Sequence, residues 1–100
     1  MAVLVIGEIE GGDAALDARM MQDLGQQNAP TARRPLAVCA GPSANGWRVI
    51  GIWDTEDDYR TFEREKLTPM FSRMGINHRV EVSPLERVSI APAAAAQAAR

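Results

Sequence analysis

The chain has 100 residues, of which 46% are hydrophobic and 24% charged, the size and composition of a single globular domain. Its formal net charge of −2 provides no basic surface for phosphate groups, so we expect no nucleic-acid partner. The single cysteine excludes an internal disulfide, and no apolar run approaches the ~20 residues that span a bilayer. We therefore expect a soluble, cytoplasmic protein with no membrane partner.

The first predicted element is a strand over residues 3–10, rich in β-branched residues and closed by two glycines. A helix is expected next, with Asp13 as its N-cap and Gly25 at its end. Its apolar residues recur at a spacing of four, which predicts a narrow stripe facing the core. The stripe consists of Leu16, Met20 and Leu24.

Residues 26–35 contain two prolines and no periodicity, which predicts a surface loop. A short strand over residues 36–40 follows, then turn residues, then a strand over residues 47–53. The two strands are expected to form a hairpin. The second is apolar on both faces, with Trp47, Val49, Gly51 and Trp53 on one side and Ile50 and Ile52 on the other.

Thr55, with Asp58 three residues later, predicts the start of a second helix. An apolar stripe runs along it at spacings of three to five, and Gly75 suits its end. Pro69 removes a backbone donor, so the helix should kink or restart near residues 67–68. The stripe is made of Tyr59, Phe62, Leu67, Met70, Phe71 and Met74.

The last predicted strand covers residues 79–83, with Val80 and Val82 on one face. Pro84 marks a bulge or an edge, and residues 85–90 are a candidate for further pairing. We expect one domain over residues 1–90 and a disordered, Ala-rich tail over residues 91–100.

The element order βαββαβ predicts an α+β, ferredoxin-like fold with both helices on one face of a four-stranded antiparallel sheet. The other face would then expose large apolar side chains, among them Trp47 and Trp53, at a considerable free-energy cost. We therefore expect a homodimer in which these faces pack together into an α/β barrel. In this arrangement the helices cover the Ile50 and Ile52 side, and the partner covers the tryptophan side.

Residues 47–75 resemble the antibiotic biosynthesis monooxygenase-like proteins of the dimeric α/β-barrel superfamily. The resemblance is carried by a strand-end Trp53, the capping Thr55, the pair Tyr59 and Phe62, and the Leu67-x-Pro69 break. It implies the fold and the dimer. The superfamily includes cofactor-free oxygenases of aromatic polyketides, polyketide cyclases, haem-degrading enzymes and proteins without a known reaction.

Haem-degrading members combine the strand-end Trp with an Asn on the first strand and a His on the second helix. Here the first strand has Gly7 and Glu8, and the second helix has no His. The resemblance therefore implies neither haem nor another cofactor, and no set of residues with metal-ligand spacing is present in the sequence.

The expected ligand pocket is apolar, with Trp53 as a stacking wall or, alternatively, as a core residue. Its other candidate residues are Trp47, Val49, Cys39 and Arg48. The alternative for Trp47 is a rim position, and the alternative for Cys39 is a small buried side chain.

The candidates for proton transfer are His78, Glu8 and Tyr59. Two functions remain open. One is a dimeric protein that binds an apolar or aromatic small molecule as a cofactor-independent monooxygenase or cyclase of secondary metabolism. The other is a non-catalytic binding or accessory dimer with a filled interior.

Overall fold

The computed structural model describes residues 1–26 and 34–91. Residues 92–100 of the predicted tail over residues 91–100, and residues 27–33 of the predicted loop over residues 26–35, lie outside the described residues. The elements follow in the order β1 (Val3–Glu10), α1 (Ala14–Gln26), β2 (Ala37–Ser43), β3 (Gly46–Trp53), α2 (Glu56–Phe62), the π-helical segment η1 (Glu63–Leu67), α3 (Thr68–Met74) and β4 (His78–Pro84).

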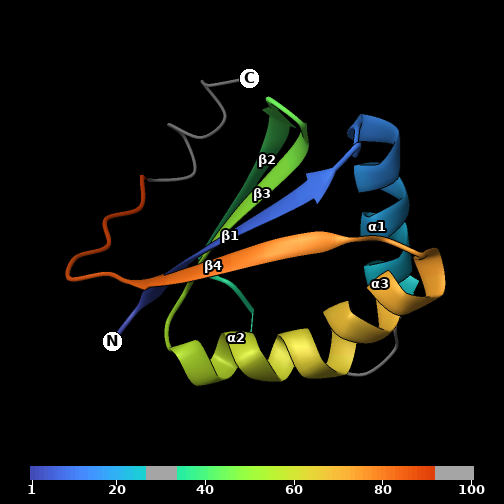
Figure 1. The fold of residues 1–100 in the computed structure, drawn as a ribbon. Helices are drawn as coiled ribbons and strands as arrows, with labels where there is room; N and C mark the ends of the chain where they lie inside the picture. The colour runs from blue at the N-terminus through green and yellow to red at the C-terminus, as the bar shows by residue number, and fades with distance from the viewer. Residues whose placement is uncertain (27–33, 92–100) are drawn as a thin grey trace.

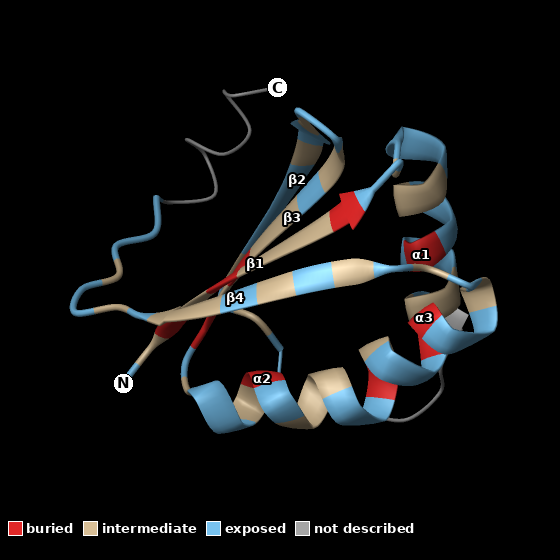
Figure 2. Ribbon diagram, in the orientation of Figure 1, coloured by how far each residue is buried: buried red, intermediate tan, exposed pale blue. Residues whose placement is uncertain are grey.

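The strands form one antiparallel sheet in the order β2-β3-β1-β4, and the helices lie on one side of it (Figure 1). This is the predicted α+β, ferredoxin-like arrangement. Buried residues gather where the sheet meets the helices (Figure 2). Among the described residues, no helix has the length and apolar character needed to cross a membrane.

The helices cover the tryptophan face of the sheet. Val3 of β1 pairs with Trp53 of β3, so the two side chains share a face, and both pack in one buried cluster with Tyr59 of α2. The expectation that the helices cover Ile50 and Ile52 was therefore wrong. Alternation along a strand separates two faces but does not identify the one that receives the helices, because both are apolar here.

The predicted first helix is confirmed at its start and on its apolar side. The Asp13 carboxylate accepts a hydrogen bond from the Leu16 amide at 2.8 Å, which caps α1. Leu16, Met20 and Leu24 pack in a second cluster against α3. The helix ends at Gln26, one residue beyond the predicted glycine.

The second helical region begins as predicted, with the Thr55 hydroxyl accepting from the Asp58 amide at 3.1 Å. It then widens into the π-helical segment, where the Thr68 amide donates to the Glu63 carbonyl five residues back. Pro69, which has no amide hydrogen, follows directly. The region ends at Gly75, whose φ of 66° is left-handed. The predicted restart near residues 67–68 is confirmed.

The hairpin between β2 and β3 is longer than predicted, because β2 continues to Ser43 and leaves a two-residue turn. β2 is an edge strand, where Pro42 is tolerated. β4 starts one residue earlier than expected, at His78. The described residues after Pro84 form no further strand, although the Leu85 amide donates to the Ala2 carbonyl at 2.8 Å.

Candidate functional site

A cavity of about 620 Å³ lies between the tryptophan face of the sheet and the helices. Strands and helices both contribute to its mostly apolar wall. From the sheet come Val5, Gly7, Ile9, Val38, Val49, Gly51, Trp53, His78 and Val80; from the helices come Met20, Met21, Leu24, Gly25, Tyr59, Phe62, Lys66, Leu67, Met70 and Phe71; Arg34 and Pro35 complete the lining.

Two glycines of the sheet line the cavity in different ways. A Cβ atom added to Gly7 would make an ordinary contact with the Val49 carbonyl at 3.8 Å, so there is room there for a small side chain. A Cβ added to Gly51 would lie 3.1 Å from the Trp53 indole nitrogen, so the absence of a side chain at Gly51 lets the Trp53 ring lie against the sheet.

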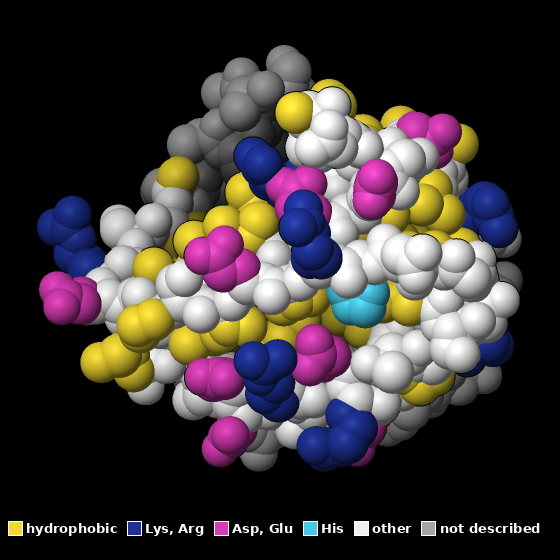
Figure 3. Space-filling view, viewed as in Figure 1, with side chains coloured by type: hydrophobic (Ala, Val, Ile, Leu, Met, Phe, Trp, Pro, Cys, Tyr) yellow, Lys and Arg dark blue, Asp and Glu magenta, His cyan; other side chains and the backbone are white. Residues whose placement is uncertain are grey.

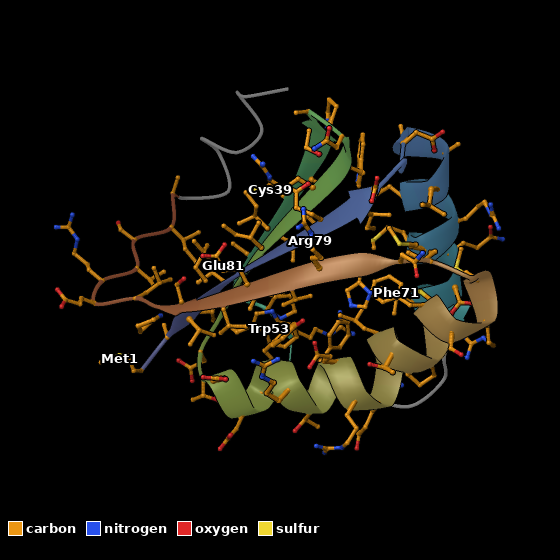
Figure 4. All side chains as sticks on the ribbon, in the orientation of Figure 1. Met1, Cys39, Trp53, Phe71, Arg79 and Glu81 are labelled. Carbon is orange, nitrogen blue, oxygen red and sulfur yellow. The ribbon has the colours of Figure 1, made fainter. Side chains whose placement is uncertain are left out.

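Trp53 belongs to the core and also lines the cavity. It is 3% exposed, and its ring makes an edge contact with Tyr59 at 5.7 Å between centroids and a tilted contact with Phe62 at 5.1 Å. Figure 4 shows Trp53 between the sheet and α2. Its position is fixed by these rings, which makes it a rigid wall for a ligand.

Tyr59 contributes its ring to the same wall. Its hydroxyl donates to the Glu63 carboxylate at 3.0 Å. Burial raises the pKa of this hydroxyl, and the bond to Glu63 raises it further. Tyr59 is therefore a protonated phenol at neutral pH whose proton is already held by Glu63.

His78 opens β4 opposite Ile9 and lines the cavity. Its ring centroid lies 4.1 Å from that of Phe71, at an interplanar angle of 42°. Figure 3 shows the imidazole at the end of a band of hydrophobic side chains between the sheet and the helices below it. The fold thus brings His78, Tyr59, Val49 and Trp53 to one cavity.

Glu8, Arg48 and Cys39 lie on the opposite face of the sheet. Glu8 accepts hydrogen bonds from the Arg48 guanidinium and from the Ser43 hydroxyl, the latter at 2.9 Å. These bonds, led by that from Arg48, lower the pKa of Glu8. Cys39 is exposed on β2, away from Trp53 (Figure 4). The structure does not bring these three residues together with the cavity.

Trp47 is not among the residues that line the cavity. Its indole donates to the Asp17 carboxylate at 3.0 Å, and its ring packs against the cluster around Ile9 and Met20. It ties the start of β3 to α1.

Lys66 and Arg34 were missed by the sequence analysis as cavity residues. Lys66 is 6% exposed on the π-helical segment, within the apolar stripe. Lys66 lies four residues after Phe62 and four before Met70, and this helical spacing is the signal that could have found it, because residues four apart share one side of a helix. Among the described residues, no group of three His, Cys, Asp or Glu could hold a metal ion.

Comparison with known proteins identifies the fold. No family model and no curated protein matches the chain. Solved structures are similar, among them the following two. A mutant form of SnoaB, a cofactor-independent oxygenase from Streptomyces nogalater, is 11% identical with a TM-score of 0.56, over 87% of this chain and 95% of that one. A Deinococcus radiodurans protein, provisionally described as an antibiotic biosynthesis monooxygenase, is 10% identical with a TM-score of 0.55, over 92% and 100%. The chain has the fold of the antibiotic biosynthesis monooxygenase-like proteins.

Proposed function

We propose that this protein binds an apolar, aromatic small molecule in the cavity beside Trp53 and promotes its cofactor-independent oxygenation or cyclisation. The cavity carries the proposal. Its volume of about 620 Å³ falls in the range of small-molecule sites, and its wall is mostly apolar with few polar groups. A flat ring would lie beside Gly7 with its edge against Trp53.

The chemistry would come from orientation and from proton transfer. His78 supplies an imidazole to the wall of the cavity, and histidine is the side chain that most often acts as a general base, so it is the proposed base. Tyr59 would act as a hydrogen-bonded part of the wall, since its proton is held by Glu63. The description of SnoaB as a cofactor-independent oxygenase supports this class of reaction.

We also propose that the working unit is a homodimer formed through the open face of the sheet. On the two central strands that face carries Leu4, Ile6, Ile50 and Ile52, all partly exposed. The sheet of a second protomer would remove this surface from water. Full burial of each of these side chains would stabilise the dimer by about 1.5–3 kcal/mol. Each protomer would keep its own cavity between its sheet and its helices.

A fluorescence titration with 2-naphthoate and 2-naphthamide tests binding. We expect saturable quenching at one ligand per chain. Trp53→Phe should weaken the affinity measured by calorimetry about two- to tenfold, the usual contribution of one aromatic pair. Trp53→Phe should also abolish the quenching by the ligand. The remaining fluorescence would come from Trp47, which does not line the cavity. Absence of binding by both ligands would contradict the proposal.

Turnover separates an enzyme from a binding protein. Anthrone and dioxygen give anthraquinone and water without an added reductant, so oxygen uptake with anthrone is a suitable assay. We expect uptake above the uncatalysed rate and a loss of at least about a hundredfold in His78→Gln, the lower end of the usual effect of a positioned base. Tight binding of anthrone without added uptake would favour the non-catalytic binding protein instead.

A further inference from the structure

The charged side chains that line the cavity are all cationic in the part of the chain that the structure describes. Lys66 and Arg34 contribute to the lining, whereas no Asp or Glu among residues 1–26 and 34–91 does so. An apolar cavity with charge of one sign selects for a ligand that carries the opposite charge.

Lys66 is the buried member of this set. It is 6% exposed and lies on η1, between Phe62 and Met70, which also line the cavity. Burial of an ammonium is costly unless it has partners. Lys66 has an interaction within the chain, but an ammonium has three donors and can serve a ligand oxygen as well.

Neither carboxylate of η1, Glu63 or Glu65, lines the cavity, and Glu63 is engaged elsewhere. It accepts from the Tyr59 hydroxyl at 3.0 Å and from the Arg60 guanidinium at 3.1 Å, and it does not line the cavity. Arg60 is in turn bonded to Glu56 at 3.2 Å. The negative charge of this region therefore lies on its outer side, while Lys66 and Leu67 line the inner side.

We propose that the ligand of the cavity is an aromatic carboxylic acid, whose carboxylate accepts a hydrogen bond from the Lys66 ammonium while its ring lies beside Trp53. This inference rests on the proposed function, since it requires that the cavity binds a small molecule. It adds the charge and the functional group of that molecule, and it gives Lys66 a role in specificity.

Calorimetry with 2-naphthoate and 2-naphthamide, which share a ring but differ in charge, tests the inference. The wild-type protein should bind naphthoate at least about tenfold more tightly, because hydrogen bonds between charged groups are the stronger class. Lys66→Met keeps a similar volume and should remove this preference by weakening naphthoate alone. Lys66→Arg should restore part of it. Arg64→Met, which removes an exposed cation from the same π-helical segment, should leave it unchanged.

Three results would overturn the inference, and they separate it from the proposed function. Equal affinities in the wild-type protein would refute the carboxylate preference while the cavity still binds aromatic molecules. A preference that survives in folded Lys66→Met, or is lost only in Arg34→Met, would refute the role of Lys66. Failure of both ligands to bind would remove the proposed function and this inference together. The wild-type comparison decides the charge preference even if Lys66→Met does not fold.

Discussion

Trp53 is part of both the hydrophobic core and the cavity wall. Its ring is held by Tyr59 and Phe62, and its indole nitrogen lies above Gly51, where no side chain competes for space. Because the Trp53 side chain is already fixed in the folded protein, little further conformational entropy is lost when a ligand binds against it. The same contacts explain why both interpretations of Trp53, core residue and pocket wall, describe it correctly.

Tyr59 should make stability depend on alkaline pH. Its pKa is raised in the folded protein, so the unfolded chain loses this proton first as the pH rises above about 10, the ordinary value for tyrosine. The stabilisation is complete below that pH and falls above it. Urea unfolding from about pH 8 to about pH 11 should therefore show a steeper loss of stability in the wild-type protein than in Tyr59→Phe. Parallel curves would contradict the assignment.

The burial of Lys66 in the cavity wall was not predicted from the sequence. Lysine is rarely buried, so a lysine within an apolar stripe is normally counted as a solvent-facing residue. Here Lys66 lies four residues from Phe62 and from Met70, so it shares their side of the helical region and lines the cavity with them.

At the scale of the elements, local signals were sufficient for most boundaries. The caps at Asp13 and Thr55, the left-handed Gly75 and the break before Pro69 each depend on interactions within a few residues, and each was predicted. The choice of sheet face depends on packing between distant segments. Both faces of β3 are apolar, and the contact of Trp53 with Tyr59 of α2 shows which of them lies against the helices.

That choice of face decides which candidate residues share the cavity. Residues of one parity, including Val49 and Trp53, line it together with His78, while Glu8 and Arg48 fall on the other side. The strand pattern alone groups Trp53 with Val49 correctly. The strand pattern cannot show that His78 lies beside Trp53 and Val49. His78 reaches the cavity because β4 pairs with β1 in the folded sheet.

At the scale of the whole molecule, the open face has the composition of an interface. The apolar centre around Ile6 and Ile50 has charged neighbours on the same face, Glu8 and Arg48 on the central strands and Arg79 and Glu81 on β4 (Figure 4). This composition supports the proposed homodimer, in which a second copy of the chain would cover the face.

Sedimentation tests the dimer. We expect the wild-type protein to sediment as a dimer at micromolar concentration, and Ile50→Lys to give a folded monomer because it places a charge in the apolar centre of the interface. Gln22→Lys adds the same charge to an exposed position on α1 and should leave the dimer intact. A folded wild-type monomer would show that the face has another role.

One pair of variants tests whether the space beside Gly7 is a ligand site. Gly7→Val adds a side chain on the cavity side of the sheet, where a Cβ would lie 3.8 Å from the Val49 carbonyl, and Gly41→Val adds the same side chain where nothing lies within 4 Å, on the opposite face of the sheet. Valine suits a strand better than glycine, so both should fold. In calorimetry with 2-naphthoate, we expect binding to be lost in Gly7→Val and to remain at the wild-type level in Gly41→Val. Unchanged binding by a folded Gly7→Val would contradict the account.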